Sequence, residues 1–188
     1  MKLQELEIIG LPKRFDIYEI FDELNPVSET LDPDSIKYDS YPLEGGDGRD
    51  EQAEMFFKYD ESATGVEVVY TRFTQNMRVW LSNLAVEADV KLFADVINTV
   101  LKLHPRAKLY DGLSRLPGIS PDDVNLMVKE RNQYLKRRLK GVKPFAMEGL
   151  NAGFSVQPEF LHGTDELDVL MKKLQENFVK AQWDFSEI

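Results

Sequence analysis

Apolar side chains recur along the chain with two spacings, and these spacings predict both strands and helices. Short runs rich in branched and aromatic residues predict strands at 3–9, 55–59 and 107–110. Two longer runs of the same kind, 66–73 and 77–84, are separated by only three polar residues. So short a polar separation predicts an antiparallel hairpin in the middle of the chain.

The spacing of one helix face recurs in four other segments. Residues 17–24 and 87–103 carry apolar positions three and four apart, with the second stripe the wider of the two. A third helix has clear boundaries, because Ser120 can cap its start and Gly141 can close its end. Thr164 is expected to cap a last helix with its apolar face over 167–178.

This order of elements predicts an α+β fold, in which three to four helices pack mainly on one face of an antiparallel or mixed sheet. Two short extended pieces are expected near 145–147 and 154–157. A length of 188 residues predicts a single domain over 1–188. Residues 27–54 lack periodicity and are rich in proline, glycine and acids, so we expect a mobile acidic loop or a covering segment there.

Composition adds constraints on chemistry and location. The chain has no cysteine, which excludes disulfides, thiolate nucleophiles, iron–sulfur clusters and cysteine-based zinc sites. Acids interrupt the first residues, where a signal peptide needs apolar ones, and no run approaches the roughly 20 apolar residues of a membrane span. The expectation is a bacterial cytoplasmic protein with no membrane partner.

Charge is divided unevenly along the chain. Residues 1–65 hold 17 acids and 6 bases, whereas 66–188 are nearly balanced with 16 acids and 17 bases. Within the second part, 129–143 carries seven bases against one acid. On a helix, Lys129, Lys136, Arg137 and Lys140 form one basic stripe opposite an apolar one.

The basic stripe has three interpretations. The first is a solvated face that only promotes solubility, which is what charge runs usually are. The second is internal pairing with the acidic first third of the chain, although surface ion pairs contribute only about 0–1 kcal/mol. The third is nucleic-acid binding through the helix at 120–140. A net charge of −10 opposes that third interpretation and makes nucleic acid an unlikely partner.

The acidic first third suggests a basic protein partner instead. A carboxylate-rich surface that includes Asp47, Asp50 and Glu51 can accelerate encounter with such a partner. Trp183 and Phe185, near the end of the chain, form a tail that either docks on the body or anchors a partner.

No pattern of catalytic, metal-binding or cofactor-binding residues is complete. Two histidines alone, His104 and His162, cannot make a three-histidine metal site. The glycines at 45–48 lack the lysine and hydroxyl of a phosphate loop, and 112–116 lacks the second glycine of a nucleophile elbow. We therefore predict no catalytic residues, no metal and no cofactor.

The leading hypothesis is a non-enzymatic cytoplasmic protein-binding or accessory protein, of which an immunity-type inhibitor of a basic partner is one form. The alternative is a hydrolase-like enzyme that uses dispersed carboxylates. A second alternative is a nucleic-acid binder acting through the basic helix.

Overall fold

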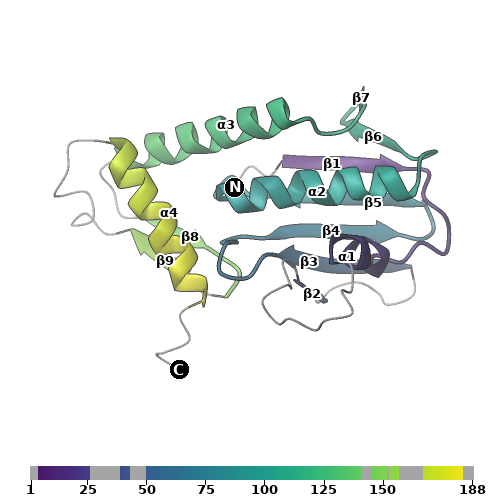
Figure 1. The fold of residues 1–188 in the computed structure, drawn as a ribbon, viewed down its shortest axis with the longest axis horizontal. Coiled ribbons are helices and arrows are strands. Elements are labelled where there is room, and N and C mark those ends of the chain that lie inside the picture. The colour runs from purple at the N-terminus through teal and green to yellow at the C-terminus, as the bar shows by residue number, and fades with distance from the viewer. Residues whose placement is uncertain are drawn as a thin grey trace.

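A seven-stranded antiparallel sheet forms the body of the protein (Figure 1). The computed structural model describes residues 4–25, 39–42, 50–140, 145–151, 153–156 and 167–183. The strand order is β2-β3-β4-β5-β1-β6-β7. The strands are β1 (Gln4–Ile9), β2 (Asp39–Pro42), β3 (Glu51–Phe57), β4 (Val66–Thr71), β5 (Asn76–Leu81), β6 (Lys108–Asp111) and β7 (Ser114–Leu116).

The central hairpin is confirmed as β4 and β5, with Val66 opposite Leu81 and Thr71 opposite Asn76. Its strands end earlier than predicted, because the Gln75 N–H donates to the Thr71 carbonyl at 2.9 Å and turns the chain. Phe73 therefore lies in the turn, 85% exposed, and not in a strand. The N-terminal strand β1 pairs with β5 on one side and with β6 on the other, so it is an interior strand of the sheet.

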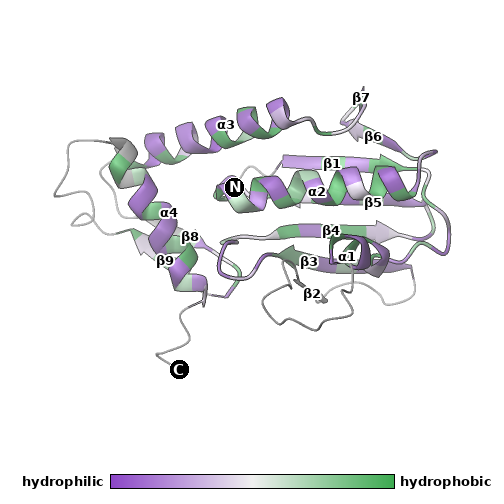
Figure 2. Cartoon of the chain, in the orientation of Figure 1, coloured by the Kyte–Doolittle hydropathy of each residue, from purple (hydrophilic) through white to green (hydrophobic). Residues whose placement is uncertain are grey.

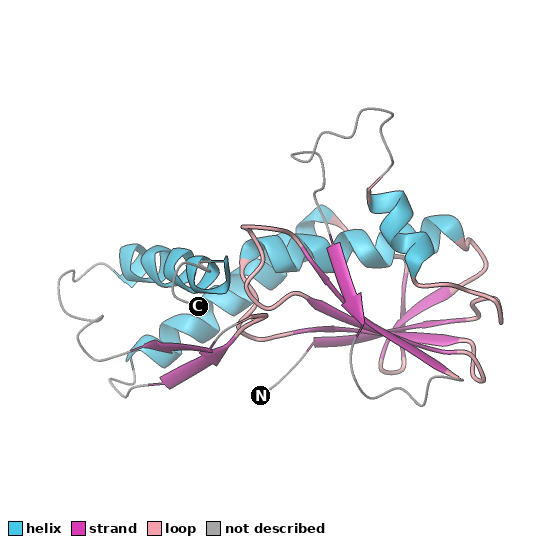
Figure 3. Cartoon of the chain, turned by 90° about the horizontal axis from the view of Figure 1, so that it is seen from below, coloured by secondary structure: helices cyan, strands magenta, loops and turns pink. Residues whose placement is uncertain are grey.

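Four helices accompany the sheet: α1 (Tyr18–Leu24), α2 (Glu87–Leu103), α3 (Pro121–Lys140) and α4 (Leu167–Trp183). Helix α2 lies across the sheet with hydrophobic and hydrophilic residues alternating along it (Figure 2), and its buried apolar residues pack with those of the strands. Helices α1 and α2 cover one face of the sheet, whereas the other face carries no helix within the described residues (Figure 3). The α+β fold class is therefore confirmed. No described helix combines the length and the apolar character needed to cross a bilayer.

The main hydrophobic cluster lies between the sheet and the helices. Alternate strand residues such as Ile8, Val68 and Val79 point into it and are fully buried, as strand periodicity requires. Helix α2 supplies Phe93, Val96 and other apolar residues, and the first half of α3 adds Met127.

A second hydrophobic cluster lies at one end of the molecule. The short hairpin β8 (Phe145–Glu148) and β9 (Gly153–Val156) packs there with α4 and the second half of α3. Its buried members are Ala63, Leu84, Val86, Leu135, Leu139, Met147, Val156, Met171, Leu174 and Phe178. Helix α3 therefore contributes to both clusters.

The secondary structure of the segment 27–54 needs correction where it is described. Residues Asp39–Pro42 form β2, and β3 begins at Glu51 and not at Met55. These residues are strands because they pair with β3 and β4, for example Pro42 with Glu54 and Glu51 with Thr71. The rest of 27–54 lies outside the described residues, apart from Asp50. Strand β7 was also not predicted from the sequence.

Candidate functional site

A pocket of about 840 Å³ lies between the start of α2 and the C-terminal half of α4. The loop that joins β3 to β4 forms its third side. We call this pocket the α2–α4 groove. Its lining residues are Lys58, Asp60, Glu61, Val86, Glu87, Ala88, Lys91, Gln175, Glu176, Val179, Lys180 and Trp183. The α4 residues are spaced three and four apart, so a single stripe of that helix forms one wall.

The buried carboxylate of Asp89 fixes the loop beside the groove. One of its oxygens accepts hydrogen bonds from the N–H groups of Thr64 and Val86, both at 3.1 Å, and the other accepts from Gly65 N–H at 3.1 Å. Burial raises the pKa of Asp89, and the hydrogen bonds from the loop and from Val86 oppose that change. Gly65 has a φ of +64°, and a Cβ there would lie 2.8 Å from the Phe56 carbonyl oxygen. The first turn of α2 and the β3–β4 loop are therefore held as one unit.

Trp183 of α4 contacts the same β3–β4 loop. Its indole N–H donates to the Ser62 carbonyl at 2.9 Å. Its ring lies 5.7 Å from Phe57 and 5.2 Å from Tyr59, measured between ring centroids. The sequence placed Trp183 in a tail; it is instead the last residue of α4, half-buried, and it lines the groove. Phe185 lies outside the described residues.

Two further contacts hold α4 against the β8–β9 hairpin. Gln182, 1% exposed, accepts a hydrogen bond from Asn151 N–H at 2.9 Å through its side-chain oxygen. The Asn151 amide in turn donates to the Gln182 backbone carbonyl at 2.8 Å. The preceding residue in the hairpin turn, Leu150, donates its N–H to the Ala63 carbonyl at 2.9 Å. The α4 wall and the loop are thus positioned by the same short turn.

The rim of the groove carries charges of both signs. Lys58 pairs with Glu61, and Lys91 pairs with Glu87 at 2.7 Å. The hydrogen bond and the charge of Glu87 raise the pKa of Lys91, and the charge of Glu61 adds to this effect. The carboxylates on this side therefore create a local field that favours positive charge.

Three of the four residues of the predicted basic stripe lie on α3 with described side chains. Lys129 and Arg137 are exposed and Lys136 is half-buried, while the side chain of Lys140 is not among those described. Arg137 donates through Nε to the Gln133 carbonyl at 3.3 Å. Arg131, counted among the seven bases, instead turns inward, 5% exposed, and donates to the Ser82 carbonyl at 3.1 Å. Burial lowers its pKa.

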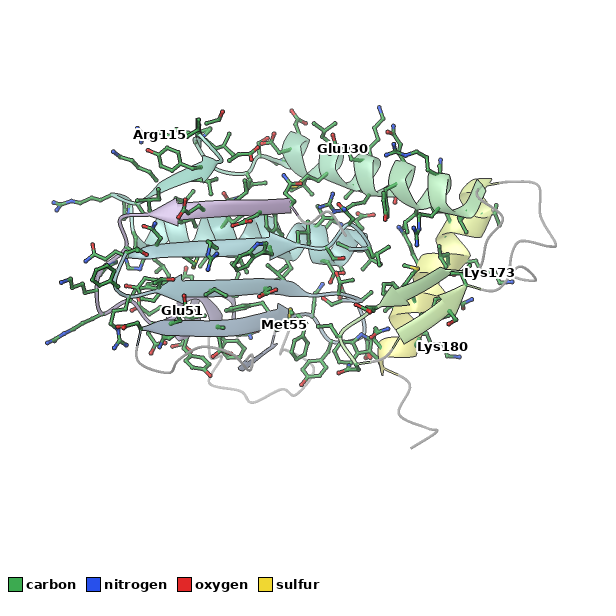
Figure 4. The ribbon with its side chains drawn as sticks, turned by 180° about the vertical axis from the view of Figure 1, so that it is seen from behind. Glu51, Met55, Arg115, Glu130, Lys173 and Lys180 are labelled. Carbon is green, nitrogen blue, oxygen red and sulfur yellow. The ribbon has the colours of Figure 1, made fainter. Side chains whose placement is uncertain are left out.

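Asp50 and Glu51, two described acids of the first third, lie at the start of β3. Asp50 is exposed just before β3, and Glu51 lies half-buried on that strand with Oε1 accepting from the Thr71 hydroxyl at 3.3 Å. Strands β4, β5 and β1 separate β3 from β6, and Figure 4 shows Glu51 at the opposite side of the sheet from Glu130 of α3. This position separates Glu51 from the basic stripe of α3. Asp47 lies outside the described residues.

Sequence reasoning missed most of the groove. Its lining comes from three segments that are about 30 and 90 residues apart, and no local spacing connects them. Trp183 was the one lining residue singled out beforehand, because a tryptophan near a chain end needs a partner surface. Among the described residues, no group of three histidine, aspartate or glutamate side chains could hold a metal ion.

Comparison of the chain with protein-family models, with curated proteins and with solved structures gives no match.

Proposed function

We propose that this protein is a non-enzymatic cytoplasmic accessory protein that binds a segment of a partner protein in the α2–α4 groove. The single observation behind the proposal is the groove itself, an open pocket of about 840 Å³ with an aromatic side chain fixed in its wall. Pockets that hold ligands in proteins commonly have volumes of about 300–1,000 Å³ and combine apolar walls with a few placed polar groups.

The composition of the groove supports a protein segment as its occupant. Val86, Ala88, Val179 and Trp183 supply apolar surface, and charged side chains surround them. Interfaces between proteins combine an apolar centre with a polar rim in this way, and tryptophan is over-represented among their energetically dominant residues. The hydrogen bond to Ser62 restricts the Trp183 side chain before any partner arrives, so less entropy is lost on binding.

The charge of the whole chain supports a basic partner. A net charge of −10 raises the rate at which a positively charged protein reaches the surface. Because this long-range attraction is screened within about 8 Å at physiological salt, association should slow when salt is raised.

A blocking variant tests the proposal. Glu176→Trp places a bulky side chain at an exposed position on the α4 wall of the groove. We expect the tagged variant to lose most of the partner that the wild-type protein captures from host extract. The binding of a partner identified in this way can then be followed by surface plasmon resonance at two salt concentrations.

Two control variants make the result specific. Lys173→Trp adds the same side chain to an exposed position of α4 that does not line the groove, and capture should be unchanged (Figure 4). Charge reversal of Lys129 and Arg137 together tests the basic helix as the binding surface. Equal capture by Glu176→Trp and the wild type would refute the groove as the site, and loss only on charge reversal would favour nucleic acid or another acidic partner.

A further inference from the structure

Two charged side chains that line the α2–α4 groove make no ion pair within the described ranges: Asp60 and Lys180. The other lining charges are engaged, since Lys58 and Lys91 pair with Glu61 and Glu87, and Glu176 lies 3.8 Å from Lys172. The charge selectivity of the groove therefore depends mainly on which of these two side chains the occupant meets.

Asp60 lies next to the aromatic side of the groove. It directly follows Tyr59, whose ring contacts Trp183, and its own φ of +55° turns the chain at this point. The neighbouring Glu61 is also acidic. A carboxylate and an indole ring that line the same groove offer a cation two attractions, a charge pair and the negative face of the ring.

We propose that the α2–α4 groove binds the guanidinium group of an arginine in the partner's segment, with the indole of Trp183 on one side and the carboxylate of Asp60 on the other. This inference rests on the proposed function, because it names the residue that the partner inserts. The argument is charge complementarity together with a fixed aromatic ring. Arginine fits better than lysine because its planar group stacks on aromatic rings and can bond a carboxylate through two N–H groups.

Lys180 gives the proposal a second, opposite consequence. It lies three residues before Trp183 on α4, on the same wall, and its charge repels a guanidinium. Reversing its sign should therefore strengthen the binding of arginine. If the groove instead received an acidic side chain, the same change would weaken binding.

Trp183 itself can report on the test. The chain has two tryptophans, and Trp80 lies on β5, away from the groove, with the Arg78 guanidinium 4.8 Å above its ring. Trp80→Phe leaves Trp183 as the only tryptophan in an otherwise complete chain. Its fluorescence is titrated with three peptides that differ at one position: acetyl-Leu-Arg-Leu-amide and the same peptide with citrulline or with glutamate.

The expected result is a saturable change with the arginine peptide and an affinity about fivefold lower for the uncharged citrulline peptide. Asp60→Asn should remove most of this preference, and asparagine tolerates the positive φ at that position. Lys180→Glu should increase the affinity for the arginine peptide several-fold.

The outcomes separate this inference from the proposed function. Equal binding of the arginine and citrulline peptides, tighter binding of the glutamate peptide, or no saturable change with the arginine peptide up to about 10 mM would each overturn the inference. In any of these cases, loss of the partner by Glu176→Trp but not by Lys173→Trp would leave the proposed function standing.

Discussion

Glu54 is a buried carboxylate on the helix-covered side of β3, 6% exposed, and one of its oxygens has no hydrogen-bond partner among the described residues. Burial raises its pKa, the charge of Asp16 raises it further, and a hydrogen bond with Tyr18 acts in the opposite direction. In the unfolded chain the same group titrates near its ordinary value of about 4.3. The folded state therefore holds the proton to higher pH than the unfolded state does.

The sign of this difference gives a pH-dependent prediction. As pH rises from the ordinary value toward the raised folded value, the unfolded state ionises first and the free energy of unfolding falls. Glu54→Gln removes this loss, so the variant should be more stable than the wild type at pH 7 and no more stable at pH 4. Urea denaturation at the two pH values measures the difference. A gain of the same size at both pH values would show that the charge of Glu54 is not its cause.

At the scale of elements, the β8–β9 hairpin can pack closely against α4 because residue 149 is a glycine. A Cβ on Gly149 would lie 2.4 Å from the side-chain carbon and oxygen of Gln182. Gln182 is buried and cannot move away without losing its hydrogen bonds to Asn151 and to the Phe178 carbonyl. Gly149→Ala should therefore lower the free energy of unfolding by about 1–3 kcal/mol, measured by urea denaturation.

The same hairpin supplies a matched control for this prediction. Gly153, in β9, has nothing within 4 Å of an added Cβ. Gly153→Ala should change stability by less than about 0.5 kcal/mol, or raise it slightly by restricting the unfolded chain. Equal losses for the two variants would mean that backbone conformation, and not contact with Gln182, governs both positions.

The sequence predicts best those elements whose own side chains show an apolar periodicity or a helix cap. The boundaries of α2 agree with the predicted 87–103, because its apolar stripe is wide and acids begin it. Ser120 caps α3 as expected: its hydroxyl accepts from Asp123 N–H at 3.2 Å, and Asp123 accepts from Ser120 N–H at 2.8 Å. Strands β2 and β7 were missed because they are short edge strands held by pairing with neighbours, and their own sequences do not alternate.

Side-chain roles that depend on distant partners could not be predicted. The buried carboxylate of Asp89 accepts hydrogen bonds from Thr64 and Gly65, which are about 25 residues away in sequence. Arg131 lies four residues from both Met127 and Leu135, on the apolar side of α3, but its partner, the Ser82 carbonyl, is 49 residues away in sequence. The groove depends on such contacts throughout, which explains why only Trp183 was identified in advance.

At the scale of the whole molecule, the two hydrophobic clusters divide the structure into a sheet body and an end region, with α3 spanning both. Phe178 is fully buried in the second cluster. Its truncation to alanine should lower the free energy of unfolding of the end region by about 3–5 kcal/mol. We expect Phe178→Ala to lose amide hydrogen-exchange protection in α4 and the β8–β9 hairpin while β4 and β5 keep theirs.

Hydrogen exchange followed by mass spectrometry measures this difference directly. Phe93→Ala, in the main cluster, is the comparison, because it removes a buried phenylalanine of the same size from the sheet body. A uniform loss of protection across both regions in Phe178→Ala would mean that the two clusters unfold as one cooperative unit.

The position of β1 in the middle of the sheet also constrains the order in which the chain can fold during synthesis. This strand leaves the ribosome before its pairing partners, which begin at Asn76 and, on the other side, at Lys108. Strands β3, β4 and β5 are consecutive and can pair as soon as they are made. Leu6 and Ile8 of β1, which are buried in the folded sheet, must therefore wait exposed until the strands on both sides of β1 have been made.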